Sequence, residues 1–234
     1  MADLKVLTVI PARKGSKGVP GKNKKLLNNK PLVMYYLEFA SKLPSNYHTI
    51  LSSDDAEILE LGKQVNIDNN GLRPEHLSND NALTLEVLNY ELNLAEKRLN
   101  TSFDAVLLLQ PTCPNRSFKH LENIENTFIK HNKKCSVVSV KRIISEHPFR
   151  MKRFVKGNLL INYVDQGIED MRPRQELPPV YIRNGSVYFS PADIIREKSS
   201  MVTEECYGFE MDETHSINID SLDDFYLAEK KLIT

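Results

Sequence analysis

The chain has 234 residues, of which 41% are apolar, so it is long enough to form one ordinary domain with a buried core. Its 31 basic and 31 acidic residues balance, which excludes an overall charge that would favour nucleic acid or a membrane surface. The three cysteines form no C-x-x-C pair, which indicates reduced thiols and no zinc ribbon. No apolar run is long enough for a signal sequence or a membrane span, so we expect a cytoplasmic protein.

Short β-forming runs alternate along the chain with longer segments of helical periodicity. We expect buried strands at 5–10, 48–52, 105–109 and 136–140, and helices at 32–42, 56–65, 83–99 and 118–131. This order predicts an α/β fold with a three-layer, doubly wound, mainly parallel sheet and helices on both faces. Ligands bind such sheets beyond the carboxyl ends of the strands, so a site is expected after Ile10, Ser52 and Leu109.

Prolines and arginines interrupt this pattern between about 141 and 183, which predicts an excursion from the sheet. After it we expect a strand at 180–190, a final strand at 216–219 and a helix at 222–232. Ser221 and Asp224 have the spacing to cap that last helix. We therefore expect residues 1–234 to form a single domain from which this excursion protrudes.

The segment that follows the first expected strand is rich in glycine and basic residues. The eleven residues from Arg13 to Asn23 include three glycines and four cations. Glycines let backbone amides approach phosphate oxygens, and Arg and Lys neutralise a polyphosphate, so the loop predicts a nucleoside triphosphate site. A flexible, solvated basic loop is the alternative. The glycine spacing fits neither a P-loop nor the G-x-G-x-x-G dinucleotide fingerprint.

This loop and several later motifs resemble a known enzyme family. Residues 10–23 and 26–31 are similar to the N-terminal signature of the cytidylyltransferases that activate nonulosonic acids, the CMP-sialic acid synthetases and their pseudaminate and legionaminate relatives. Further similarities follow in the family's order: Leu72-Arg73-Pro74, Leu109-Gln110-Pro111-Thr112 with Pro114 and Arg116, Arg172-Pro173-Arg174-Gln175, Arg183-Asn184-Gly185-Ser186-Val187-Tyr188, and Ser216-Ile217-Asn218-Ile219-Asp220.

The resemblance implies a Rossmann-like nucleotidyltransferase fold with a small protruding dimerisation element, and a homodimer. It also implies transfer of CMP from CTP to the anomeric hydroxyl of a nine-carbon 2-keto acid sugar, with Mg²⁺ as cofactor and pyrophosphate as product. A cytidylyltransferase for the eight-carbon acid Kdo is a same-chemistry alternative. A non-catalytic nucleotide-binding regulator of the same fold is another.

For the nucleotide, the resemblance implies that Arg13 and Lys22 are catalytic and hold the phosphates, as charge stabilisation of an in-line attack requires. The other implied nucleotide contacts are Ser16, Lys17, Asn23, Arg73, Asp80 and Asn81. Arg73 could equally be a surface arginine before a turn proline, and Asp80 and Asn81 could be helix caps.

For the acceptor, the resemblance implies that Gln110 and Thr112 face the sugar and that Arg174 binds its carboxylate, often from the neighbouring subunit. Gln110 and Thr112 could instead belong to a simple strand-terminating turn, and Arg174 could be an ordinary surface or interface arginine. We expect Asn184 and Gly185 to form a turn or bulge before a strand.

For the metal, many family members carry aspartate at the two positions occupied here by Asn218 and Asp220. An amide oxygen can bind a hard cation but supplies no charge, so Asp220 is the expected Mg²⁺ ligand and a catalytic residue, with Asn218 beside it. Asp220 could instead only provide a favourable charge at a helix N-terminus. Asp54 and Asp55 are expected to cap a helix, and Cys113 is expected to be a packed thiol.

Overall fold

The computed structural model describes residues 4–165 and 171–232. Within them, the central sheet has six strands in the order β10-β6-β9-β5-β1-β4. Strands β1, β4 and β5 are parallel to one another, β6 and β10 are parallel, and β9 runs antiparallel to β5 and β6. The sheet is therefore mainly parallel, as the sequence predicts. The strands are β1 (Val6–Pro11), β4 (Tyr47–Ser52), β5 (Ala105–Leu108), β6 (Ser136–Ile143), β9 (Val180–Pro191) and β10 (Cys206–Glu210).

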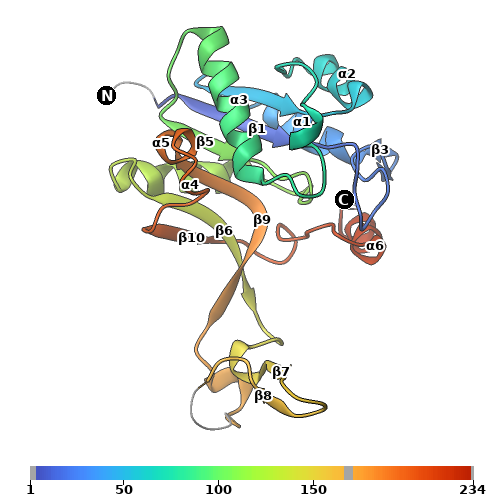
Figure 1. Cartoon of the computed structure of the whole chain (residues 1–234), viewed down its shortest axis with the longest axis vertical. Coiled ribbons are helices and arrows are strands. Elements are labelled where there is room, and N and C mark those ends of the chain that lie inside the picture. The colour runs from blue at the N-terminus through green and yellow to red at the C-terminus, as the bar shows by residue number, and fades with distance from the viewer. Residues whose placement is uncertain (1–3, 166–170, 233–234) are drawn as a thin grey trace.

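Helices cover both faces of the sheet and produce three layers (Figure 1). Successive side chains of β1 alternate between the faces, so Val6 and Ile10 join one hydrophobic cluster while Leu7 and Val9 join the other. The first cluster includes helices α1 (Leu32–Ala40), α2 (Ala56–Gln64), α4 (Phe118–Lys130) and α6 (Leu222–Lys231). The second includes α3 (Thr84–Leu99) and α5 (Ala192–Arg196).

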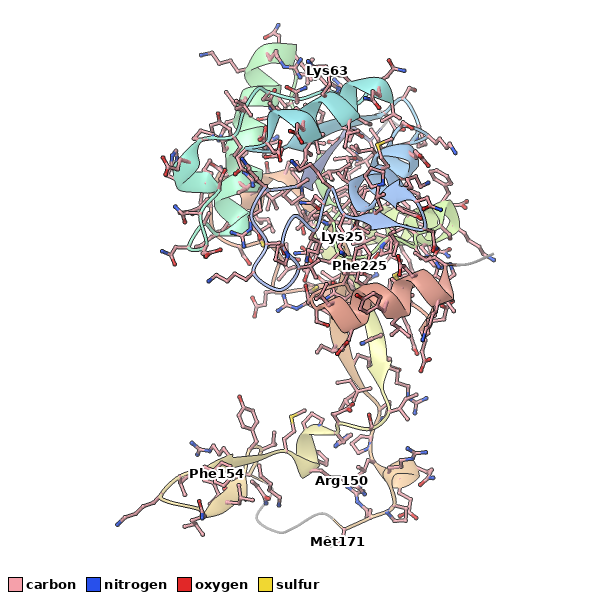
Figure 2. The ribbon with its side chains drawn as sticks, turned by 90° about the vertical axis from the view of Figure 1, so that its right-hand side faces the viewer. Lys25, Lys63, Arg150, Phe154, Met171 and Phe225 are labelled. Carbon is pink, nitrogen blue, oxygen red and sulfur yellow. The ribbon has the colours of Figure 1, made fainter. Side chains whose placement is uncertain are left out.

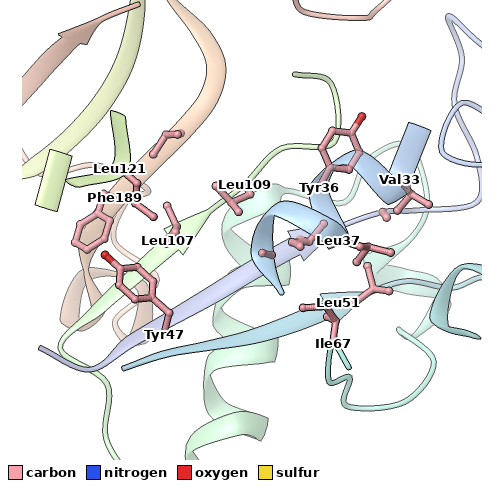
Figure 3. Packing of buried hydrophobic residues seen from close by; sticks show 14 of the residues in the cluster. Val33, Tyr36, Leu37, Tyr47, Leu51, Ile67, Leu107, Leu109, Leu121 and Phe189 are labelled. Carbon is pink, nitrogen blue, oxygen red and sulfur yellow. The ribbon is translucent and has the colours of Figure 1, made fainter. Parts of the chain in front are cut away.

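The first cluster spans most of the sheet, which fixes the ends of the strands relative to one another. Figure 3 shows Tyr36 and Leu37 of α1 above Leu51 of β4, and Phe189 of β9 on the other side of Leu107. All five of these side chains are buried. A close-packed core of this kind is rigid, so the loops at the carboxyl ends of β1, β4 and β5 have a firm support.

Residues 141–183, here called the arm, extend away from the body of the molecule (Figure 1). The arm begins as an antiparallel ribbon in which Val140–Ile143 of β6 pair with Val180–Arg183 of β9. Figure 2 labels Arg150, Phe154 and Met171 at its far end. There it carries the short strands β7 (Lys152–Phe154) and β8 (Leu160–Asn162) and the 3₁₀ turns η2 (Pro148–Arg150) and η3 (Arg174–Glu176).

The predicted helices begin and end within two residues of the observed ones, but the last strand was wrongly placed. Residues 216–219 form no strand, and the sixth strand of the described sheet is β10 at Cys206–Glu210. This strand lies at the edge of the sheet, and three of its five residues are exposed, so it lacks the apolar pattern of a buried strand. Residues 216–219 instead run beside the turn after β5, where the amide of Ile219 donates to the carbonyl of Thr112 (2.8 Å).

Three further small elements complete the described fold. None of the helices in the described residues is long and apolar enough to cross a bilayer. The short strands β2 and β3 form a hairpin directly after the basic loop. The 3₁₀ turn η1 precedes α3 in the chain. Their bounds are β2 (Leu26–Leu27), β3 (Lys30–Pro31) and η1 (Glu75–Leu77).

Candidate active site

A cavity of about 380 Å³ lies at the carboxyl ends of β1 and β5, where the fold predicts a ligand. Its wall combines the basic loop, the segment from Arg73 to the start of α3, the turn after β5 and the segment that precedes α6. Most of the predicted site residues line it, namely Arg13, Ser16, Lys22, Asn23, Arg73, Asp80, Gln110, Thr112, Asn218 and Asp220. Lys17, Asn81 and Arg174 do not.

The basic loop is held in a defined conformation by its own side chains. Asn23 is buried, its Nδ2 donates to the carbonyl of Arg13 (2.8 Å), and its carbonyl accepts from the amide of Val33 (2.9 Å). Gly18 packs against the carbonyl of Asp220 so closely that an added Cβ would lie 1.8 Å from that oxygen. The loop and the Asp220 segment therefore form one continuous wall, which excludes a freely flexible loop.

Three cations of the loop are arranged around two carboxylates. Asp80 accepts from Arg13 (2.8 Å) and lies 3.1 Å from the Lys17 ammonium, and these two cations lower the pKa of its carboxyl group. Lys22 donates to the carbonyl of Ile219 (2.8 Å) and lies 3.5 Å from Asp220. Burial lowers the pKa of Lys22, although the charge of Asp220 opposes this shift.

Arg73 is a buried cation, which excludes the alternative of a surface arginine. Its side chain is only 3% exposed, and it donates to Ser78 Oγ (3.1 Å) and Ser52 Oγ (3.4 Å). Its ion-pair partner is Asp54, whose carboxylate oxygen lies 4.0 Å from Nη2 of Arg73. Burial lowers the pKa of the guanidinium. A buried cation at a cavity wall, with its ion-pair partner as far away as 4.0 Å, favours an anionic ligand.

Asp80 and Asn81 do not cap α3, because that helix begins at Thr84 after Leu83. Asp80 pairs with the basic loop, as described above, and the Asn81 amide donates to the side chain of Asn79 (2.9 Å). Asp55 does cap α2, since its carboxylate accepts from the amide of Glu57 (3.0 Å). Asp54 instead accepts from the backbone amide of Lys14 in the basic loop (2.7 Å).

Hydrogen bonds from the side chains of Arg116 and Tyr36 hold the turn after β5 in place. Nη2 of Arg116 donates to the carbonyls of Gln110 (2.5 Å) and Ser186 (2.9 Å), and Tyr36 donates to the carbonyl of Pro111 (2.5 Å). The sequence motif contained Arg116 but gave it no role, because a buried arginine and a surface arginine look alike in sequence.

Two polar atoms on the cavity wall are buried and have no hydrogen-bond partner, Asn23 Oδ1 and Thr112 Oγ1. Buried polar groups are normally paired, so these atoms favour a polar ligand in the cavity. They belong to two separate parts of the wall, the basic loop and the turn after β5. A ligand that satisfied both would span the cavity.

Asn218 and Asp220 lie on one side of their segment although they are not in a strand. Asn218 Nδ2 donates to the Asp220 carboxylate, and Asp224 accepts from the amides of Asp220 (3.1 Å) and Ser221 (2.8 Å). Ser221 and Asp224 form the capping box of α6, as predicted. Among the described residues, no group of three His, Cys, Asp or Glu side chains could hold a metal ion.

Arg174 lies in the arm, in η3, and is exposed. It lines a different cavity, of about 280 Å³, together with Arg142, His147 and Leu177. Within one chain the structure therefore does not bring Arg174 together with Gln110 and Thr112.

The chain matches the family model described as cytidylyltransferase over residues 7–216. The chain belongs to the cytidylyltransferase family. It is therefore a nucleotidyltransferase, as the motifs indicated. The CMP-N,N′-diacetyllegionaminic acid synthase of Legionella pneumophila is 32% identical over 236 residues, which cover 97% of this chain and 96% of that protein. The N-acylneuraminate cytidylyltransferase of Streptococcus agalactiae is 29% identical over 95% of this chain, which spans about half (52%) of that relative.

Solved cytidylyltransferases share this fold at low sequence identity. A CMP:2-keto-3-deoxy-manno-octonic acid synthetase complexed with CTP superposes with a TM-score of 0.67 at 16% identity and covers 97% of both chains. A 4-diphosphocytidyl-2C-methyl-D-erythritol synthase of Anaerococcus prevotii gives 0.64 at 14% identity, with 99% of both chains covered. The three-layer, mainly parallel sheet is thus the nucleotidyltransferase fold.

Proposed function

We propose that this cytidylyltransferase transfers CMP from CTP to the anomeric hydroxyl of a nine-carbon 2-keto acid sugar and releases pyrophosphate. The acceptor would be N-acetylneuraminate or a legionaminate or pseudaminate relative, the substrate class named by relatives that match over nearly the whole chain. The observation that carries the proposal is the single cavity that joins three cations, Arg13, Lys22 and Arg73, to the polar turn of Gln110 and Thr112.

The cationic half of the cavity suits a triphosphate. Arg13 and Lys22 would bind phosphate oxygens, and Arg73 would supply a further positive charge from the buried side of the wall. Ser16, Lys17 and Asn23 extend this surface, and Asp80 holds Arg13 and Lys17 in place before the phosphates compete for them. The backbone carbonyl of Ile219 orients the Lys22 ammonium.

The reaction would be an in-line attack of the sugar hydroxyl oxygen on the α-phosphorus. The bond between that phosphorus and the oxygen that bridges it to the β-phosphorus breaks, the hydroxyl proton passes to solvent, and pyrophosphate leaves. Positioning and charge stabilisation by Arg13 and Lys22 account for such a step without a covalent nucleophile. Cys113 fits this scheme because it is buried, its thiol donates to the carbonyl of Asn184 (3.2 Å), and burial raises its pKa.

Mg²⁺ is the cofactor that we propose for this site, because a carboxylate and an amide oxygen beside a triphosphate are hard oxygen ligands of the type that Mg²⁺ uses. Asp220 would hold it, with Asn218 as a neutral second ligand, and substrate phosphates and water would complete the shell. When bound, the ion would neutralise charge on the phosphates. The Asn218 amide and the Asp220 carboxylate are in contact, and the amide would turn its oxygen toward the carboxylate to hold an ion together with it.

We propose further that the active unit is a homodimer in which the arm supplies Arg174 to the partner's acceptor site. The arm exposes large apolar side chains at its far end, including Phe154 (69%) and Tyr163 (65%), which an isolated chain would leave in water. Residues 141–183 contain nine basic and five acidic residues, a net charge of +4, so the rest of this neutral chain carries −4. Opposite charges favour docking of the arm on the body of a second copy.

A Kdo-type activity is the second candidate, because the Kdo synthetase complexed with CTP has the same fold. We favour the nine-carbon acceptors, since the relatives with those names are 26–32% identical, whereas the Kdo enzyme is 16% identical.

A pyrophosphate-release assay tests the proposed function with N-acetylneuraminate, legionaminate, pseudaminate and Kdo as acceptors at one CTP concentration. We expect turnover with at least one nine-carbon acid and strong preference for CTP over ATP and GTP, because fixed hydrogen bonds to cytosine reject other bases. Arg13→Ala serves as the inactive control. Turnover with Kdo alone would move the assignment to the second candidate, and equal use of ATP would contradict both.

A further inference from the structure

The bulge in β9 is the centre of a buried polar cluster that the proposed reaction does not use. The register of β6 and β9 shifts between Val138 and Val140, where residues 184–187 of β9, beginning with Asn184 and Gly185, lie opposite one residue of β6. Asn184 is 3% exposed, its Oδ1 accepts from Ser139 Oγ (2.6 Å), and its Nδ2 donates to Ser216 Oγ (2.9 Å). One amide thus joins β6 to the segment that leads to Asn218.

Gly185 lies directly under the acceptor side of the cavity. Its φ of +76° is in the left-handed region, and a Cβ there would lie 2.7 Å from Gln110 Oε1, 3.7 Å from Asn218 Oδ1 and 3.8 Å from Thr112 Oγ1. Side chains from two separate segments therefore converge on this glycine. Any larger residue would displace at least Gln110.

We propose that the Asn184–Gly185 bulge sets the shape of the acceptor subsite. Asn184 is a positioning residue that acts through Ser216 on the segment whose Ile219 amide holds the carbonyl of Thr112, and Gly185 is a specificity-determining residue that leaves room for Gln110 and Thr112. Ile219 is three residues beyond Ser216 and its amide donates to the carbonyl of Thr112 (2.8 Å), so a shift at Ser216 reaches the turn after β5. The identity of the acceptor rests on the proposed function, whereas the positioning by Asn184 and Gly185 rests on the contacts described above.

Two serine variants separate positioning from general stability. Ser139 and Ser216 both pair with Asn184, but only Ser216 belongs to the segment of Asn218. We expect Ser216→Ala to raise the acceptor KM by about tenfold, with the CTP KM changed by less than about twofold, because small displacements of positioned groups are costly. Ser139→Ala is the matched control. It should lower the melting temperature and leave the ratio of the acceptor KM to the CTP KM as it is in the wild type. Equal effects of the two variants on that ratio would overturn the role of Asn184.

Hydrogen exchange of backbone amides in residues 216–220 gives a readout that needs no turnover. Exchange there should be faster in Ser216→Ala and unchanged in Ser139→Ala, and the opposite order would contradict the positioning role. If the wild type transferred CMP to no nine-carbon acid, the proposed function would fail while this measurement would still decide whether the bulge orders the segment.

Gly185→Ala tests whether the acceptor subsite needs the space that the missing Cβ of Gly185 leaves, and Gly71→Ala is its control. Gly71 also has a positive φ (+92°), but an added Cβ there meets nothing within 4 Å. This control therefore has the backbone strain of an alanine at positive φ without a steric contact. We expect Gly185→Ala alone to raise the acceptor KM, by about tenfold or more, and to change the ranking of the nonulosonic acids in the panel. An unchanged ranking and an acceptor KM equal to that of the control would refute the specificity role.

Discussion

Lys22 shows how a single residue of the site can cost stability. Its pKa is lowered by burial, so the folded protein binds this proton less tightly than the unfolded chain does, and the charged form destabilises the fold at neutral pH. That cost is present below the folded pKa and is relieved as the pH rises through it. A charge kept in place at a cost to stability is typical of a functional site.

Lys22→Met should therefore reduce CMP transfer without reducing stability. We expect turnover to fall by about tenfold to a thousandfold, because a charge-assisted contact to the phosphates is lost. The melting temperature should stay the same or rise, since the apolar side chain carries no desolvation cost. Thermal unfolding and initial rates of the same preparation measure both, and a melting temperature several degrees lower would show that the bond to Ile219 outweighs the burial of the charge.

Substitutions of Asp220 and Asn218 test whether these two residues bind Mg²⁺. Asp220→Asn removes the remaining side-chain anion from this pair, so we expect a sharp loss of rate and a higher Mg²⁺ midpoint, by about tenfold. Asn218→Asp restores a carboxylate and should keep or lower the midpoint. A magnesium titration of initial rate compares the two with the wild type. If Asp220→Asn left rate and midpoint unchanged, Asp220 would only support the N-terminus of α6.

At the scale of an element, the basic loop depends on one close approach. Gly18 touches the backbone of Asp220, whereas a Cβ on Gly15 would meet nothing within 4 Å. Gly18 is therefore needed for a close approach that Gly15 does not make, although the two glycines look alike in sequence. The contact at Gly18 couples the loop to α6, which begins two residues after Asp220.

Gly18→Ala should destabilise the protein, and Gly15→Ala should not. The clash at Gly18 is with backbone, which cannot move as a side chain can, so we expect a loss of about 1–3 kcal/mol in the free energy of unfolding. Urea unfolding of the two variants measures the difference. Equal stability of both would show that the loop moves away from Asp220 without cost.

At the scale of the whole molecule, the arm keeps Arg174 apart from the cavity that contains Gln110 and Thr112. In a dimer of the proposed kind, each active site would combine Lys22 of one chain, at the phosphates, with Arg174 of the other, at the acceptor. Such a shared site predicts that two inactive variants can complement each other.

Mixed dimers of Lys22→Ala and Arg174→Ala subunits should regain activity that neither variant has alone. In these dimers, one site combines an intact Lys22 with an intact Arg174 from the partner, so about a quarter of wild-type activity is expected after random subunit exchange, with one functional site in half of the dimers. Sedimentation should give twice the 26.8 kDa of one chain. No recovery in dimers shown to be mixed would place Arg174 in its own subunit's site, and a fully active monomer would refute the shared site.

Local patterns allowed most of the fold to be predicted. Buried strands such as β1 and β5 have continuous apolar runs, and α2 and α4 have helical periodicity and capping residues, so neighbours along the chain determine them. β10 was missed because it is an edge strand whose pairing with β6 decides its conformation. The bulge at Asn184 was predicted in place, but its contacts with Ser139 and Ser216 join segments far apart in the chain.

The sequence by itself determined the α/β class, the position of the basic loop and the motifs that identify the family, because each depends on residue order over short stretches. Only the tertiary structure decided which charges are buried. Arg73 lies in the cavity wall and Arg174 lies out on the arm, although both are arginines beside a proline. Burial depends on segments that meet through folding, here β4, α3 and the residues after β5, and no local pattern records how closely such segments pack around a guanidinium group.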